Sequence, residues 1–252
     1  MKDAGFGLLL AIQFLTRLPV PVECPWRPAT SRWALRCYPL VGLLLGALLA
    51  GVAALLQGLL PTPLLALALL SVWIGLSGGL HLDGLMDVAD ALGSNMPLER
   101  RWEIMKDPQV GSFGILALVF LLAWKGMLLW ALLEADLPLA LLVAIPALSR
   151  FAAVALLCLA PCARREGLAW VWRQHLRQRD LPLSFIPLSL LFLWLPQWTI
   201  LLGGLLVFVS LYTLAMIRSF TGINGDIVGA AIEGGELWLL LIGWSWWSFV
   251  MA

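Results

Sequence analysis

The chain has 252 residues, of which 62% are hydrophobic and 12% are charged. A soluble domain is roughly 45–50% apolar and about 25% charged, so a water-soluble globule of this length could not bury so much apolar surface. The composition excludes a soluble enzyme, a disordered chain and a disulfide-stabilised secreted domain, and the net charge of +1 gives no reason to expect a nucleic-acid partner.

The first predicted element is the apolar segment 6–18, which ends at Thr16 and Arg17. A signal peptide is one interpretation, but a single lysine precedes the segment and no clear cleavage site follows it. We therefore expect an uncleaved interfacial or re-entrant helix at the N-terminus.

Seven later segments have the apolar character of membrane-spanning helices, although the fifth and seventh are short. They are 39–60, 64–80, 113–133, 137–160, 183–195, 198–217 and 237–250. We place the break between the fifth and sixth at Pro196 and Gln197, because proline cannot continue a helix interior. Runs such as 115–123 lack the alternation of β-barrel strands. The sequence predicts an all-α polytopic bundle of about seven spans, with residues 1–252 forming one integral-membrane domain.

The connections between these segments form two sets. Short connections at 61–63, 134–136 and 196–197 contain no lysine or arginine, whereas long charged ones cover 19–38, 81–112, 161–182 and 218–236. Of the 16 lysines and arginines, 14 lie in the long set or at the N-terminus. The positive-inside rule then places the N-terminus and the long loops in the cytoplasm.

An acidic cluster marks the start of the loop 81–112. Asp83, Asp87 and Asp90 share one face of a helix, where like charges repel one another. A divalent cation is the simplest compensation, and Mg²⁺ usually binds through one or two carboxylates plus substrate phosphates. Gly84 leaves room for a large ligand beside these acids. The alternative is an ordinary solvated helix face.

A second acid, Asp226, lies among glycines in the loop 218–236, two residues after Asn224. Alone this motif is weak, because a glycine-rich turn would explain it equally well. Two glycine-flanked acidic motifs on one membrane face nevertheless suggest a composite metal site, with the active site formed by the loops 81–112 and 218–236.

The mixed-charge segment 99–108 lies between these motifs. Its spacing allows Glu103 to pair with Lys106 on a short amphipathic helix that ends near Asp107, before Pro108. Lys106 could hold phosphate oxygens. The alternative is an interfacial helix whose long cations extend to the membrane surface.

Two cations, Lys125 and Arg150, fall inside predicted spans. Ionisable groups in a membrane are expensive and are functional candidates by default. They could face a polar cavity and hold an anionic substrate, or they could pair with acids for structure alone. His81 is a candidate base on another helix face, and it is not assigned to Mg²⁺, which rarely uses imidazole.

The pattern His81-x-Asp83-Gly84-x-x-Asp87-x-x-Asp90 closely resembles the signature of cobalamin synthases, the adenosylcobinamide-GDP ribazoletransferases. The resemblance covers nearly the whole chain and includes segments 14–21, 38–42, 103–107, 149–150, 165–167 and 225–230. One departure is Asn224, which stands where we expect a threonine.

The resemblance implies a Mg²⁺-dependent, multi-pass enzyme of the cytoplasmic (inner) membrane. A hydroxyl of α-ribazole, or of its 5′-phosphate, would attack the cobinamide-linked phosphate of adenosylcobinamide-GDP and release GMP. Such a transfer needs charge neutralisation and positioning more than covalent help from the protein.

We assign roles to particular residues as a hypothesis. Asp83, Asp87 and Asp226 would bind Mg²⁺, while Asp90 would be a further ligand or the base. Lys106 and Arg150 would engage phosphates. The remaining expected substrate contacts are His81, Gly84, Glu103, Asp107, Lys125 and Asn224.

Two other functions remain open at this stage. A CDP-alcohol phosphatidyltransferase also has clustered aspartates, but here Gly84 directly follows the first aspartate and the expected Ala-Arg pair is missing. A cation-coupled transporter would suit Lys125 and Arg150, but the acids cluster at the cytoplasmic face. The lipid bilayer is an expected partner, and a homo-oligomer is compatible with the sequence because any span could face a second copy.

Overall fold

The computed structural model describes residues 2–136, 138–193, 195 and 198–251. These residues contain twelve α-helices and no strand, which confirms the all-α prediction. The helices are α1 Lys2–Leu15, α2 Pro28–Arg36, α3 Tyr38–Leu56, α4 Thr62–Ser77, α5 Leu80–Gly93, α6 Leu98–Ile104, α7 Ser112–Glu134, α8 Ala140–Leu159, α9 Gly167–His175, α10 Asp180–Ser189, α11 Trp198–Phe220 and α12 Gly225–Trp246. A 3₁₀ helix, Leu190–Leu193, follows α10, and a π-helical turn, Trp247–Met251, follows α12.

Five segments are long and apolar enough to cross a membrane: α3, α7, α8, α11 and Gly225–Val250, which contains α12. The chain is therefore a multi-pass membrane protein. Helix α4 passes the same test only together with α5, and the two are bent by 90° relative to each other. We treat α5 as lying outside the five spans.

The described residues contain fewer long apolar helices than the seven predicted spans. The predicted span 183–195 corresponds to α10, which has 10 residues and contains Pro187, followed by the 3₁₀ helix. These pieces do not form one long apolar helix. The predicted break at Pro196 and Gln197 lies outside the described residues.

The last span is longer than predicted. The predicted charged connection 218–236 is helical from Gly225 onward, because α12 begins there and includes Asp226, Glu233 and Glu236. Glu233 and Glu236 are buried there because cations from other helices pair with them.

Helix α8 forms the centre of the bundle, and α3 packs against it at very short range. A Cβ atom added at Gly42 would lie 2.5 Å from the carbonyl oxygen of Pro146. One added at Gly46 would lie 2.4 Å from the carbonyl oxygen of Leu142. Only glycine permits this approach of the two backbones. Two groups of buried apolar side chains result, one around α8, α3 and α4, and the other around α1, α2, α9 and the start of α12.

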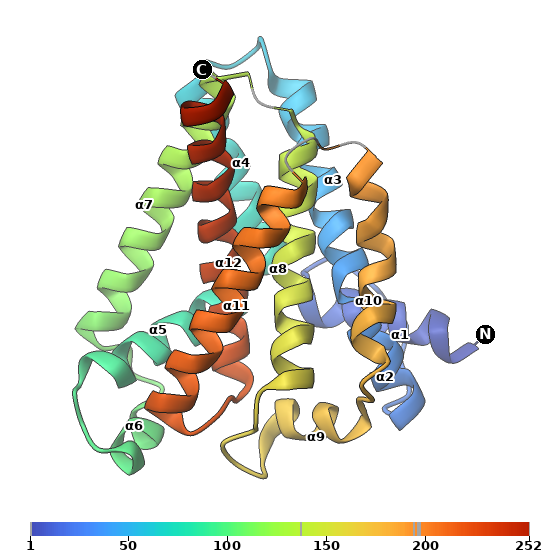
Figure 1. Cartoon of the computed structure of the whole chain (residues 1–252), viewed down its shortest axis with the longest axis vertical. Coiled ribbons are helices and arrows are strands. Elements are labelled where there is room, and N and C mark those ends of the chain that lie inside the picture. The colour runs from blue at the N-terminus through green and yellow to red at the C-terminus, as the bar shows by residue number, and fades with distance from the viewer. Residues whose placement is uncertain (1, 137, 194, 196–197, 252) are drawn as a thin grey trace.

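The two ends of the bundle differ. The short α3–α4 connection lies at the upper end in Figure 1, whereas α1, α2, α5, α6 and α9 lie in the lower half. This arrangement brings the segments that carry most of the predicted site residues to one end of the molecule.

Candidate active site

The acids of α5 and Asp226 of α12 lie at one helix crossing. A Cβ atom added at Gly84 would lie 2.8 Å from the carbonyl oxygen of Asp226 and 2.9 Å from its Cα. The absence of a side chain at Gly84 therefore lets α5 reach the first turn of α12. This contact joins the two acidic motifs that the sequence analysis combined into one site.

The surroundings of Asp87 are acidic. Burial, followed by the charges of Asp83, Asp226 and Asp90, raises the pKa of Asp87 from its ordinary value of 3.8 to about 7. In the described part of the chain, no lysine, arginine or histidine forms an ion pair with Asp83, Asp87 or Asp226. The cluster therefore carries negative charge that the protein does not neutralise.

The carboxylates do not form a closed metal cage. Across the described ranges, no group of three or more histidine, cysteine, aspartate or glutamate side chains is placed to hold a metal ion by itself. The ligand set Asp83, Asp87 and Asp226 stays a prediction, and it requires further oxygen ligands from a substrate or from water.

Asp90 has a different environment from the other acids on its helix. Its carboxylate accepts hydrogen bonds from the backbone N–H groups of Gly111, at 2.7 Å, and Gly114, at 2.9 Å. These groups belong to the start of α7, where free N–H groups and the helix dipole favour an anion. Asp90 therefore fixes α7 against α5, a role that the sequence does not predict because the motif does not show that the start of α7 lies beside α5.

Asn224 contacts the site through Asp226. Its Oδ1 accepts a hydrogen bond from the backbone N–H of Ile227 at 2.9 Å, which caps α12. Its Nδ2 donates to Oδ2 of Asp226 at 2.8 Å. Asn224 thus starts the helix and orients the carboxylate at the same time.

The loop residues pair differently from the prediction. Glu103 binds Arg100 at 2.5 Å, and Lys106 binds Glu166 at 2.8 Å, with all four side chains largely exposed. The expected Glu103–Lys106 pair is wrong because α6 ends at Ile104, so Lys106 is not on the same helix. Asp107, outside α6 as well, accepts a hydrogen bond from the backbone of Gln109 at 2.9 Å. The roles of Glu103, Lys106 and Asp107 toward substrate stay predictions.

Lys125 and Arg150 belong to a buried ion network. Nζ of Lys125 lies 2.6 Å from Glu233 and 2.5 Å from Glu236, and Arg150 also pairs with Glu236. Nε1 of Trp73 donates to Glu236 at 3.2 Å. Of the two alternatives for these cations, the structure supports pairing with acids rather than contact with substrate.

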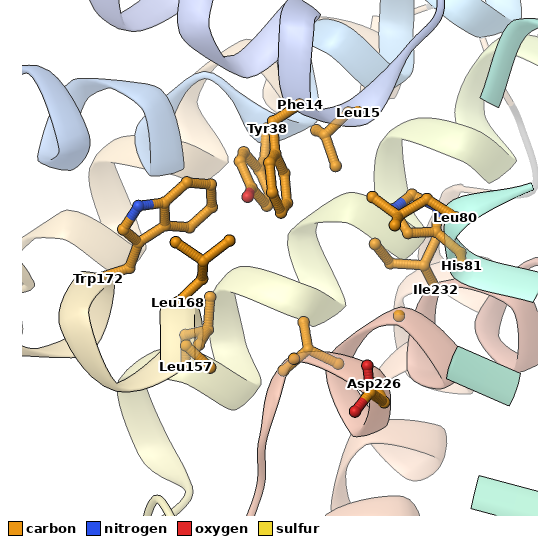
Figure 2. Close-up of a pocket in the computed structure, with 14 residues that line it drawn as sticks. Phe14, Leu15, Tyr38, Leu80, His81, Leu157, Leu168, Trp172, Asp226 and Ile232 are labelled. Atoms are coloured by element: carbon orange, nitrogen blue, oxygen red, sulfur yellow. The ribbon is translucent and has the colours of Figure 1, made fainter. Parts of the chain in front are cut away.

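A mostly apolar cavity of about 190 Å³ lies beside Asp226. Figure 2 shows it between side chains from several helices, with Phe14, Tyr38 and Trp172 toward one side and His81 toward another. His81 is 4% exposed, and its Nδ1 has no hydrogen-bond partner in the described structure. Sequence reasoning singled out His81 but missed the aromatic side chains, which resemble ordinary core residues.

Known proteins resemble this chain along almost its whole length. The family model described as cobalamin-5-phosphate synthase matches residues 7–244. A relative from Geobacillus kaustophilus is 40% identical over 262 aligned residues, covering 100% of both chains. One from Pseudomonas paraeruginosa is 42% identical and covers 96% of this chain and 98% of its own length. Both are called adenosylcobinamide-GDP ribazoletransferase.

No solved structure matches the chain significantly. The family match and the two relatives extend over almost all of the sequence, including both acidic motifs and the residues around the cavity. The chain belongs to the cobalamin-5-phosphate synthase family.

Proposed function

We propose that this chain is a membrane-embedded adenosylcobinamide-GDP ribazoletransferase. It joins adenosylcobinamide-GDP to α-ribazole, or to its 5′-phosphate, and forms adenosylcobalamin, or its 5′-phosphate, together with GMP. The observation that carries the proposal is the unpaired carboxylate cluster of Asp83, Asp87 and Asp226, within a chain that matches the family along nearly its whole length.

The chemistry of the cluster suits transfer at a diphosphate. Mg²⁺ usually binds through one or two carboxylates plus substrate phosphates, so an open acidic site completed by the substrate fits this ion. Asp83, Asp87 and Asp226 would hold it. Bound there, Mg²⁺ would neutralise charge on the phosphates as GMP leaves.

The surrounding residues position this cluster. Asn224 orients Asp226 through its side-chain amide, and Asp90 holds the start of α7 against α5. Both oxygens of Asp90 already accept backbone hydrogen bonds, so we assign it as a positioning residue instead of the base. The distribution of lysine and arginine supports a site that faces the cytoplasm from the inner membrane.

The test is GMP release by the purified protein in liposomes, with adenosylcobinamide-GDP, α-ribazole and Mg²⁺ each omitted in turn. We expect release only when all three are present. GMP release without α-ribazole would indicate a hydrolase and would overturn the proposal. CMP release with lipid formation would indicate a phosphatidyltransferase, and substrate accumulation inside sealed vesicles without GMP release would indicate a transporter.

A further inference from the structure

The cavity beside Asp226 has rigid aromatic walls. The ring centroids of Phe14 and Trp172 are 4.6 Å apart, and those of Tyr38 and Trp172 are 5.7 Å apart. Trp26 stacks on Trp172 at 6.1 Å. Tyr38 and Trp172 are each only 2% exposed, so neighbouring side chains fix their orientation. Such a fixed set of rings favours a flat aromatic ligand, which gains by stacked or edge-to-face contact.

Two buried polar atoms of residues at this cavity have no hydrogen-bond partner among the described residues. They are Nδ1 of His81 and Nε1 of Trp172, and both belong to residues that line the cavity. Buried polar groups are nearly always hydrogen-bonded, and each exception calls for an explanation. The two residues lie on different sides of the cavity in Figure 2. An occupant with one polar atom would satisfy Nδ1 of His81, whereas Trp172 presents the six-membered ring of its indole toward the other lining side chains in Figure 2.

The volume of the cavity limits which chemical groups can bind in it. Pockets for drug-sized ligands are about 300–1,000 Å³, and this cavity is about 190 Å³. It is too small for a corrinoid ring but suits one bicyclic aromatic group. Guanine carries several donors and acceptors on its edges, and most of the cavity wall is apolar, so burying guanine there would leave polar groups unpaired.

We propose that this cavity binds the benzimidazole base of the ribazole substrate. This assignment rests on the proposed function, because it names the subsite for one of the two reactants. The base is a planar bicycle with a mainly apolar edge and one free ring nitrogen, for which His81 is the nearby polar partner. Asp226 also lines the cavity, so the ribose attached to the base extends toward the carboxylate cluster.

The first experiment measures binding without turnover. The probe is 5,6-dimethylbenzimidazole, added to the full-length protein in nanodiscs and followed by equilibrium dialysis. Leu168→Trp fills the cavity from a side chain that is 47% exposed, so the fold tolerates the larger residue. Val171→Trp is the matched control on the same helix, at a position that is 42% exposed and absent from the cavity wall.

We expect Leu168→Trp to weaken binding of the probe by about tenfold or more through lost aromatic contacts, and Val171→Trp to leave it unchanged. In the GMP-release assay, Leu168→Trp should raise the KM for α-ribazole but not the KM for adenosylcobinamide-GDP. Equal probe binding by both variants, displacement of the probe by guanosine, or a raised KM for adenosylcobinamide-GDP would each overturn the assignment.

A second variant tests the polar partner. His81→Phe keeps an aromatic ring and removes both ring nitrogens, so it should weaken binding of dimethylbenzimidazole while sparing indene, a bicycle without nitrogen. Equal effects on both probes would contradict the role of His81.

The proposed function and the proposed subsite can fail separately. If the probe binds with the expected variant pattern but GMP is not released, the proposed function alone is refuted. GMP release with probe binding that does not respond to Leu168→Trp would refute the subsite alone.

Discussion

Helix α12 carries two groups of acids with opposite surroundings. Glu233 and Glu236 are buried and paired with Lys125 and Arg150, whereas Asp226 has no cationic partner among the described residues. Leaving a charge unpaired in a membrane is costly, so the paired glutamates stabilise the bundle. The unpaired carboxylate lies at the end of the helix, beside a cavity and two further acids. On this one helix, therefore, the acids paired with cations maintain the fold, whereas the acid without a cationic partner is available to a ligand.

The largest effect is expected on stability, when the buried pairing of Glu236 is broken. Glu236→Gln leaves the guanidinium of Arg150 buried without an anion, which should cost about 3–5 kcal/mol of stability. Thermal unfolding in detergent would measure the loss. The control is Glu103→Gln, which breaks an exposed pair worth about 0–1 kcal/mol. Equal losses in the two variants would show that the buried network is not structural.

Substitutions in the unpaired carboxylate cluster of Asp83, Asp87 and Asp226 should instead change the enzymatic activity. Asp83→Asn should lower GMP release by about 100-fold or more, because charge neutralisation by a metal supplies several kcal/mol to such a reaction. Membrane insertion should be intact. Arg177→Ala, at the same end of the molecule but outside the cluster, should release GMP at nearly the wild-type rate. Wild-type activity in Asp83→Asn would refute the metal-site interpretation.

The contact that brings the unpaired acids together can be tested at Gly84. Gly84→Ala places a methyl group 2.8 Å from the Asp226 backbone, so α5 and α12 must separate. We expect a loss of about 1–3 kcal/mol in stability and a fall in GMP release. Gly75→Ala, where an added Cβ meets nothing within 4 Å, should be neutral or slightly stabilising.

Asp90 belongs to the acidic motif, and we propose that it acts as a positioning residue. Asp90→Ala removes the acceptor for Gly111 and Gly114 and should cost about 0.5–2 kcal/mol. Asp90→Asn keeps one acceptor oxygen and should retain much of both stability and activity. If Asp90 is the catalytic base, the asparagine variant will instead be as inactive as the alanine variant, which kinetic comparison at matched protein stability would reveal.

Solvent screening at the half-buried Asp87 reduces the last effect, a pH dependence of the metal-free protein. The pKa of Asp87 is raised from 3.8 to about 7, so the folded state holds this proton more tightly than the unfolded state. Its contribution to stability is full at low pH and is lost as the pH rises through about 7. The thermal midpoint in EDTA should fall over this range, and Asp87→Asn should remove that slope. Adding Mg²⁺ above pH 7 should restore stability, and a wild-type slope in Asp87→Asn would contradict the assignment.

Local sequence predicts part of the candidate site. The spacing of Asp83 and Asp87 places them on one helix face, and the glycines around Asp226 indicate a second motif of the same kind. The role of Asp90 was not readable, because it depends on two N–H groups more than twenty residues away. The aromatic cavity was also hidden, since Phe14, Tyr38 and Trp172 come from separate helices.

The sequence by itself determined that this protein is helical and lies in a membrane, because so much apolar surface has no other favourable solvent. It also determined that acidic motifs lie on the side rich in basic loops. Only the tertiary structure decided which charges neutralise one another. The last span could include Glu233 and Glu236 because Lys125 and Arg150 approach from other helices. Hydropathy averages neighbours along the chain, whereas the cost of a buried charge depends on neighbours in space.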